Sequence, residues 1–203
     1  MQLYIVSDRT WLHGRTLTEV LEQTLQGGAT FLQLREKELD NDTFLKEANA
    51  IKKLAKQYNV PFVINDDIEI AMACDADGAH IGQQDGSVAD AGRILGNDKI
   101  LGVSVQTVAQ ARLAQADGAD YLGVGSMFTT TTKHDADAVD METLNAICDA
   151  VTLPVVAIGG IHHGNIEQLK ATGCHGVAVI SAVLASDNIK SACHRLLEVT
   201  KDF

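Results

Sequence analysis

The 203-residue chain has little of several features that define common protein classes. Its two prolines are too few for a long disordered linker. Its four cysteines, Cys74, Cys148, Cys174 and Cys193, form no C-x-x-C pair, so neither a zinc knuckle nor a disulfide framework is indicated. No apolar run approaches transmembrane length, and the N-terminus lacks the charged leader and apolar segment of a signal peptide. We therefore expect a reduced, cytoplasmic protein with no membrane partner.

Cations are also scarce, since 16 Lys and Arg face 27 Asp and Glu, for a net charge of -11. No basic patch is visible that could neutralise nucleic-acid phosphates, so we expect no nucleic-acid partner. An acidic protein that binds an anionic ligand must concentrate its few cations locally. Arg35, Lys37 and Lys133 are the best candidates for such a cluster.

What the chain does have is a regular alternation of short apolar runs with longer segments of helical period, at a step of about 25 residues. This pattern predicts an α/β fold, a (β/α)₈ TIM barrel formed by a single domain over residues 1–203. Strands are expected at 3–6, 29–34, 62–64, 79–81, 100–103, 121–124, 155–158 and 176–180. Helices are expected at 16–26, 43–58, 68–74, 88–95, 108–116, 141–150, 165–171 and 188–199. Glycines before several strands, such as Gly28, Gly78, Gly118 and Gly173, are expected to end the preceding helix.

Polar residues follow the predicted strands repeatedly, at the end where barrel enzymes place their chemistry. Gln33 and Arg35 alternate along one strand, so both are expected to point into the barrel mouth, where an Arg would bind an anion. Asp66 and Asp85 end neighbouring strands, and two carboxylates beside a phosphate suggest Mg²⁺. The alternatives are that Asp66 caps the following helix and that Asp85 is a turn residue.

The stretch from Asp120 to Lys133 is a strand that leads into a hydroxyl-rich loop. Gly123 and Gly125 lack a Cβ and allow something to approach the backbone closely, while residues 129–132 offer threonine hydroxyls for a phosphate. The alternative is a solvated, threonine-rich surface loop. Gly159-Gly160 and Ser181, after the last two strands, suggest a second anion site. Two anion sites favour a transfer reaction between two phosphorylated substrates.

These motifs, in their order and spacing, resemble the thiamine phosphate synthase family over nearly the whole chain. The matching segments are Gln33-Leu34-Arg35-Glu36-Lys37, Ile64-Asn65-Asp66, residues 80–85 and 102–104, Thr130 to Lys133, residues 158–161 and Ile180-Ser181. The resemblance implies that hydroxymethylpyrimidine diphosphate and hydroxyethylthiazole phosphate are joined to give thiamine phosphate and diphosphate. It leaves open whether the thiazole is carboxylated, and the oligomeric state, a homodimer included.

The resemblance also implies a role for each matching residue. Gln33, Arg35, Lys37, Asn65 and Lys133 would hold the pyrimidine diphosphate, and Asp66 and Asp85 would ligate Mg²⁺. Ser104 would lie beside the reacting pyrimidine. Thr130 and Thr132 would hold the thiazole phosphate with Gly160, Ile180 and Ser181. The full substrate-binding set is Gln33, Leu34, Arg35, Glu36, Lys37, Asn65, Ser104, Thr130, Thr131, Thr132, Lys133, Gly160, Ile180 and Ser181, of which Ser104, Lys133, Arg35 and Lys37 would be catalytic.

The chain departs from the family pattern at three positions. Ser126 and Thr129 stand where members often have proline, which predicts a more mobile loop, and Gln106 stands where many have histidine. Related thiazole tautomerases use that histidine and lack most of the diphosphate-binding set, so Gln106 counts against a tautomerase. The residues also allow a Schiff-base aldolase with Lys133 as nucleophile, or a non-catalytic binding module for thiamine precursors.

Overall fold

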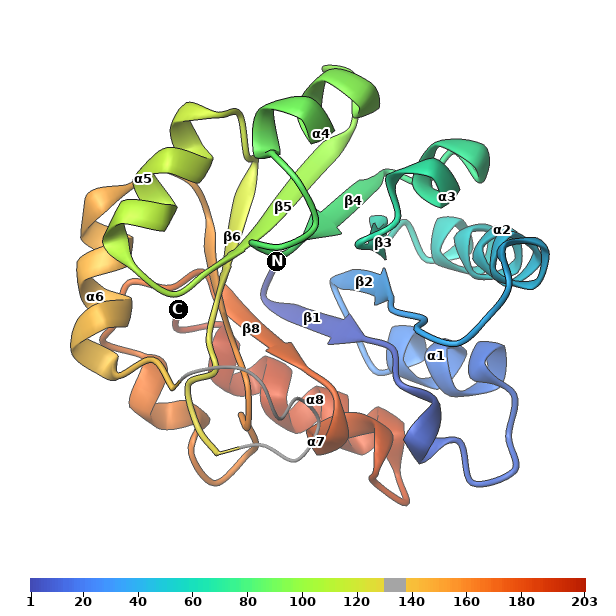
Figure 1. Ribbon diagram of the computed structural model, residues 1–203. Coiled ribbons are helices and arrows are strands. Elements are labelled where there is room, and N and C mark those ends of the chain that lie inside the picture. The colour runs from blue at the N-terminus through green and yellow to red at the C-terminus, as the bar shows by residue number, and fades with distance from the viewer. Residues whose placement is uncertain (130–137) are drawn as a thin grey trace.

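The computed structural model describes residues 1–129 and 138–203, and it shows a closed barrel of eight parallel strands surrounded by helices (Figure 1). The strands are β1 (Leu3–Val6), β2 (Phe31–Leu34), β3 (Phe62–Asn65), β4 (Gly78–Ile81), β5 (Ile100–Val105), β6 (Tyr121–Val124), β7 (Val155–Ile158) and β8 (Gly176–Val179). Each strand pairs with the next one in sequence, and β8 pairs with β1 to close the ring. The predicted barrel and its eight strands are therefore confirmed.

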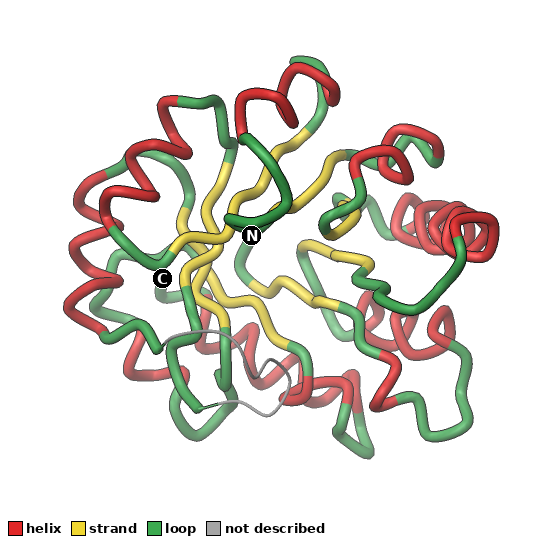
Figure 2. Tube along the Cα trace, in the orientation of Figure 1, coloured by secondary structure: helices red, strands yellow, loops and turns green. Residues whose placement is uncertain are grey.

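The helices that alternate with the strands lie on the outside of the ring (Figure 2). They are α1 (Leu17–Gln26), α2 (Asn41–Gln57), α3 (Ile68–Ala73), α4 (Val88–Leu95), α5 (Val108–Ala116), α6 (Met141–Ala150), α7 (Ser181–Leu184) and α8 (Ile189–Thr200), with 3-10 turns η1 (Arg9–Trp11) and η2 (Ile166–Leu169). Helix α1 begins at a capping box, in which Thr16 and Glu19 satisfy each other's main-chain N–H groups.

The helix predicted at 165–171 is wrong, since only the 3-10 turn η2 forms there. Asn165, which would have to cap it, uses its side chain elsewhere. Its amide donates to the carbonyl of Gly160 at 2.9 Å and accepts from the N–H of His162 at 2.8 Å. The segment is thereby tied to the loop after β7 and not wound into an α-helix. The turn η1 and the short helix α7 were not predicted.

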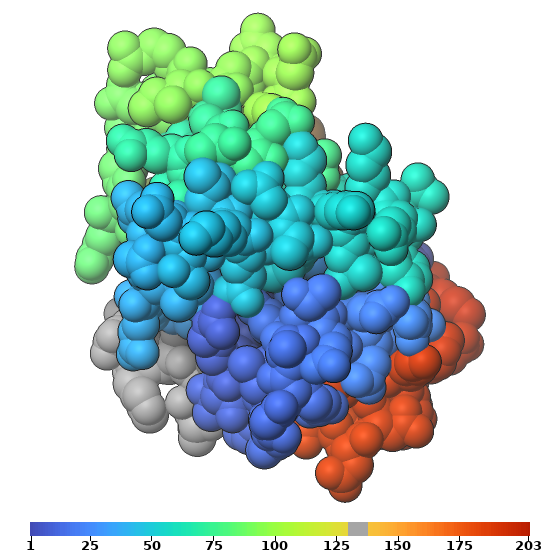
Figure 3. Space-filling view, turned by 90° about the vertical axis from the view of Figure 1, so that its right-hand side faces the viewer, coloured from blue at the N-terminus to red at the C-terminus, as the bar shows by residue number. Residues whose placement is uncertain are grey.

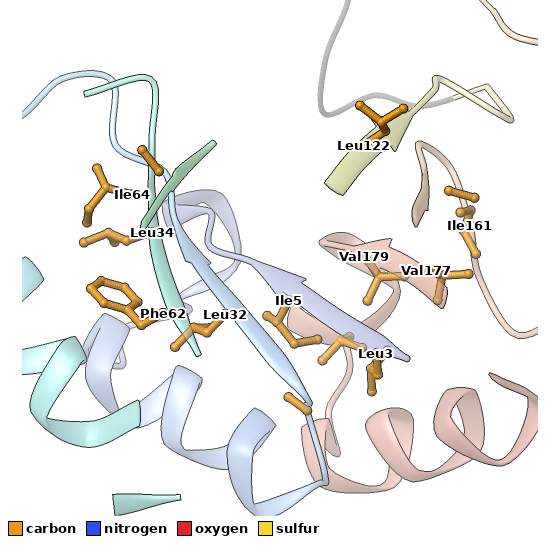
Figure 4. Close-up of a cluster of buried hydrophobic side chains, with 14 of the residues drawn as sticks. Leu3, Ile5, Leu32, Leu34, Phe62, Ile64, Leu122, Ile161, Val177 and Val179 are labelled. Atoms are coloured by element: carbon orange, nitrogen blue, oxygen red, sulfur yellow. The ribbon is translucent and has the colours of Figure 1, made fainter. Parts of the chain in front are cut away.

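Alternation along the strands gives the barrel two cores. Outward-facing side chains such as Leu3, Ile5 and Leu34 pack between the sheet and the helices (Figure 4). Inward-facing side chains fill the ring, and they include the fully buried aromatic rings of Tyr4 and Tyr121. The interior is therefore a packed core and not a channel.

The two ends of the chain meet at the seam of the ring. Val177 lies opposite Leu3 across the β1–β8 pair, and α8 packs on α1 outside it. In the side view, the red C-terminal residues adjoin the blue N-terminal ones (Figure 3). Residues far apart in sequence thus become neighbours in the completed barrel.

The prediction that glycines before the strands end the preceding helices holds at some positions and fails at Gly78. Gly27 is the C-cap of α1, and Gly118 and Gly173 have positive φ after a helix or turn. Gly78, in contrast, is the first residue of β4, and a Cβ there would lie 1.9 Å from the carbonyl oxygen of Ile100. Its role is to let two strands approach each other.

Candidate active site

The carboxyl ends of the parallel strands form one rim, and the described residues of the predicted site lie on it or just beneath it. Asn65 is the last residue of β3, and Asp66 follows it. Lys37, Asn65 and Asp66 line a pocket of about 480 Å³ between the loops after β2 and β3. Glu36, Asp67 and Glu69 line the same pocket. One ammonium group, an amide and several carboxylates therefore surround one cavity, which suits a cation that is bound together with a negatively charged ligand.

Beneath the loop after β2, Arg9 makes an ionic clamp that the sequence did not predict. Its Nε donates to Glu36 Oε2 at 2.8 Å, and its Nη2 pairs with Glu47 Oε2 on α2. The side chain of Glu36 is only 4% exposed. Burial raises the pKa of Glu47, an effect that the Glu36 carboxylate reinforces and Arg9 opposes. Arg9 thus links η1, the rim loop and α2 in one charged cluster.

Two polar atoms of that rim loop are buried without a hydrogen bond to the residues that the structure describes. They are Nε of Arg35 and Oε1 of Glu36. The main chain of Arg35 is fixed by Ser7, whose hydroxyl accepts from the Arg35 N–H at 2.8 Å. A buried donor and a buried acceptor that lie on adjacent residues and lack partners among the described residues suit a ligand in which an anion is bound together with a cation: the donor would bind the anion and the acceptor the cation. The side chain of Leu34 packs in the outer core, so a ligand could contact only its main chain.

The structure separates the roles of two adjacent aspartates. Asp67 is the N-cap of α3, and its carboxylate accepts from the N–H of Ile70 at 2.8 Å. Capping is therefore not the role of Asp66, which is exposed, has a positive φ of 63° and donates its N–H to the carbonyl of His80 at 2.8 Å. This contact ties Asp66 to β4. The helix-cap alternative for Asp66 is wrong, and Asp66 lines the rim pocket.

Asp85 lies in the exposed loop after β4 and makes a turn. Its Oδ2 accepts from the N–H of Gly82 at 2.7 Å, so the turn interpretation of this residue is confirmed. No group of three or more His, Cys, Asp or Glu side chains with metal-site geometry occurs among residues 1–129 and 138–203. The donor set for a cation at this rim thus consists of separate carboxylates, which fits an ion that retains water and substrate oxygens as ligands.

Beneath the mouth, five side chains form a chain of hydrogen bonds across the barrel interior. Gln33 Nε2 donates to Tyr4 Oη at 2.7 Å, and the Tyr4 and Tyr121 hydroxyls are 2.8 Å apart. Nδ1 of His80 lies 2.9 Å from Tyr121 Oη, and its Nε2 lies 2.9 Å from Ser104 Oγ. Burial raises the pKa of both tyrosines well above the usual value, so both phenols are protonated at neutral pH. The chain connects Gln33 and Ser104, which were predicted to contact the substrate, through Tyr4, Tyr121 and His80, for which no role was predicted.

Two glycines make room for these rings. A Cβ on Gly102 would lie 2.1 Å from Cζ of Tyr121, and one on Gly123 would lie 3.2 Å from Cε1 of His80. The close approach expected at Gly123 is therefore made by a side chain of the protein itself. At Gly125 the approach is by the main chain of Ile158, whose carbonyl oxygen would be 2.1 Å from a Cβ.

The loops after β6 and β7 pack against each other at the other side of the rim. The hydroxyl of Ser126 donates to the carbonyl of Phe128, and Gly160 lies so close to Phe128 that a Cβ would be 2.8 Å from that carbonyl oxygen. Ile180 and Ser181 lie where β8 passes into α7. Gln106 is held at the start of α5, where its N–H donates to Gln110 Oε1. Thr130, Thr131, Thr132 and Lys133 lie outside the described residues, so the predictions for them stay predictions.

A closed parallel barrel whose rim gathers carboxylates, an ammonium group and close-packed glycines defines a class of protein, the TIM barrels that bind phosphorylated small molecules at their strand ends. A family model described as thiamine monophosphate synthase matches residues 3–183. The chain belongs to the thiamine monophosphate synthase family.

Individual relatives agree with this assignment. The thiamine-phosphate synthase of Clostridium tetani is 48% identical over 96% of this chain and 93% of its own, and that of Ruminiclostridium cellulolyticum is 49% identical over 97% and 94%. The solved structure of thiamine phosphate pyrophosphorylase from Pyrococcus furiosus superposes with a TM-score of 0.91 at 35% identity and covers 98% of this chain and 95% of its own. None of the described helices has the length and apolarity needed to cross a membrane.

Proposed function

We propose that this chain is a thiamine phosphate synthase that transfers the hydroxymethylpyrimidine group from its diphosphate to hydroxyethylthiazole phosphate, plain or carboxylated. The observation that carries the proposal is the rim pocket, which Lys37, Asn65 and Asp66 line together. The buried Nε of Arg35, which has no hydrogen bond to the described residues, belongs to the same loop after β2 as Lys37. The family assignment supports the same reaction.

In this mechanism the C–O bond between the pyrimidine methylene and the diphosphate breaks, and the electron pair leaves with the diphosphate. The electron-rich aminopyrimidine stabilises the resulting cation, and the thiazole nitrogen then forms the new C–N bond. Arg35, Lys37 and Lys133 stabilise the negative charge that builds up on the leaving group, and Asn65 orients it. No side chain has to act as a nucleophile.

Asp66 and Asp85 are the residues that would hold Mg²⁺. The buried Oε1 of Glu36, which has no hydrogen bond to the described residues, and the exposed carboxylate of Asp66 fit a hard cation near this pocket. When bound, Mg²⁺ would neutralise charge on the diphosphate. The protein's part is to keep these carboxylates at the mouth, which the Asp66–His80 main-chain bond and the Asp85–Gly82 turn do.

The thiazole phosphate is assigned to the opposite side of the rim, with Thr130, Thr131 and Thr132, Gly160, Ile180 and Ser181 as its contacts. Gly160 and the strand-to-helix junction at Ser181 offer main-chain N–H groups of the kind that bind phosphate. We also place the enzyme in the cytoplasm, acting on small molecules without nucleic-acid or membrane partners, in keeping with its net charge of -11. Light scattering of the purified protein would determine whether it is a homodimer.

The test is to supply the purified protein with both substrates and Mg²⁺ and to measure thiamine phosphate. Asp66→Asn should lose Mg²⁺-dependent turnover by at least about tenfold while thiazole phosphate binding is kept. Asp90→Asn is the matched control, because Asp90 is an exposed residue of α4 that pairs with Arg93 and does not line the pocket, so turnover should be unchanged.

Three outcomes would contradict the proposal. Product no higher than in a Lys133→Ala control would exclude the synthase. Tight binding of the substrates without turnover would favour a binding module for thiamine precursors. Borohydride trapping of an aldehyde on Lys133 would favour a Schiff-base aldolase.

A further inference from the structure

The interior hydrogen-bond chain has a direction, which its end at Gln33 determines. The amide Nε2 of Gln33 donates to Tyr4 Oη, so the Tyr4 hydroxyl uses a lone pair there and has its one proton left for its other neighbour. That neighbour is the hydroxyl of Tyr121 at 2.8 Å. Tyr121 Oη therefore accepts from Tyr4, and its own proton must go to Nδ1 of His80 at 2.9 Å.

The same count of donors and acceptors fixes the position of the hydrogen on the imidazole ring of His80. Because Nδ1 of His80 accepts a proton from Tyr121, the neutral ring must carry its hydrogen on Nε2. Nε2 then donates to Ser104 Oγ, 2.9 Å away. Ser104 Oγ accepts this hydrogen bond from His80, so its own O–H is directed to another acceptor.

We propose that this chain is a polarised relay, in which Tyr4, Tyr121 and His80 are positioning residues that make Ser104 a hydrogen-bond donor toward an acceptor atom of the substrate in the barrel mouth. The identity of the ligand rests on the proposed function, but the direction of the relay does not.

The opposite direction conflicts with the orientation of the Gln33 amide, whose Nε2 faces Tyr4 Oη. If Ser104 donated to Nε2 of His80, then Nδ1–H would donate to Tyr121 and Tyr121 to Tyr4. The Tyr4 proton would then point at the amide N–H₂ of Gln33, and two donors would face each other in a buried site. This mismatch would leave a desolvated donor unpaired, which is costly.

Burial and packing keep the relay in one arrangement. Tyr4 and Tyr121 are 2% and 1% exposed, and their rings pack edge to face with each other. The glycines at 102 and 123 leave room for the Tyr121 and His80 rings. Raised phenol pKa values keep one proton on each tyrosine, which a directional chain requires.

The direction is tested first without any substrate. Protein labelled with ¹⁵N-histidine should show, for His80, an unprotonated Nδ1 and a protonated Nε2 in a long-range ¹H–¹⁵N correlation spectrum. The His80 signals are assigned by their loss in a His80→Asn variant. A protonated Nδ1, alone or together with Nε2, would overturn the relay. This measurement stands even if the chain does not catalyse the proposed reaction.

The function of the relay is tested by a double-mutant cycle. Tyr121→Phe and Ser104→Ala should each lower kcat/KM by about tenfold, the size of one neutral hydrogen bond, and the double variant should be no worse than the poorer single one. Multiplying losses, or an unchanged kcat/KM in Tyr121→Phe, would contradict the inference. Tyr58→Phe is the matched control, because the Tyr58 hydroxyl bonds to Gln26 outside the barrel.

Discussion

Removing the charge of Arg9 should destabilise the protein far more than removing a comparable surface charge. In Arg9→Met the carboxylates of Glu36 and Glu47, which are 4% and 19% exposed, lose the cation between them. Breaking a buried ion pair costs about 3–5 kcal/mol, but Arg9 is itself 42% exposed and partly screened, so we expect a loss of about 2 kcal/mol in the free energy of unfolding. For a chain of this length that corresponds to a fall in Tm of about 4–8 °C.

The loss should depend on pH in a defined direction. The pKa of Glu47 is already raised above its ordinary value of 4.5 by burial, and the variant removes Arg9, which opposes that rise. The folded variant therefore binds a proton more tightly than the unfolded chain does, so its stability falls as pH rises from about 4.5 through the raised folded-state pKa. The difference between wild type and variant should be small below pH 4 and largest at pH 7.

Thermal unfolding followed by circular dichroism at pH 4 and pH 7 checks both statements. Arg93→Met serves as the control, because Arg93 pairs with Asp90 while both side chains are exposed, and its loss should cost less than about 0.5 kcal/mol. Equal losses in the two variants, or a loss for Arg9→Met that does not change with pH, would refute the argument.

Three other changes test single features of the fold by thermal unfolding. Asp67→Ala should cost about 1 kcal/mol as the cap of α3 is lost, whereas Asp67→Asn should be nearly neutral, and equal losses would contradict the capping role. Gly78→Ala should lower the free energy of unfolding by at least about 3 kcal/mol, because its Cβ would lie 1.9 Å from the carbonyl oxygen of Ile100. Gly96→Ala should lower it by only about 1 kcal/mol, because that residue has open space around it and only its φ of 80° is unfavourable for alanine. The reverse order of losses would be inconsistent with the packing. Hydrogen bonds from Lys52 and Lys99 lower the pKa of Asp75 to about 2, so the stability that Asp75 contributes is present above pH 3.8 and lost as the pH falls toward 2. Asp75→Asn should therefore be less stable than wild type at pH 5 and equally stable at pH 2. A difference that persists at pH 2 would count against the ion pairs.

Much of the architecture could be predicted from local pattern, because each βα unit repeats the same alternation of apolar strand and amphipathic helix. β1, β6 and β7 begin and end at the predicted residues. Prediction failed at residues 165–171, because the side chain of Asn165 bonds to the loop after β7 and does not cap a helix. A helix cap at Asp66 was left open by the sequence, and the structure decides against it because only the adjacent Asp67 has the extended backbone that a cap requires.

In the candidate site, too, the residues at the strand ends could be predicted, whereas their partners from distant parts of the chain could not. Gln33, Asn65 and Ser104 could be placed at strand ends because strand alternation is a local property. The partners that orient them could not, since Tyr4 and Tyr121 are 117 residues apart and meet only across the closed ring. Arg9 was missed for a related reason, because its partner Glu47 lies on α2, 38 residues away, and an isolated Arg after a strand carries no signal of its own.

The closure of the ring through β1 and β8 has a consequence for incomplete copies of the chain. A chain that ends before Gly176 can pair its first seven strands in order, but β1 and β7 each keep one side without a neighbour. Unpaired parallel edges readily recruit strands from other molecules. Premature termination late in the message should therefore yield a protein prone to aggregation and not a slightly weakened enzyme, since the last strand is what removes both exposed edges at once.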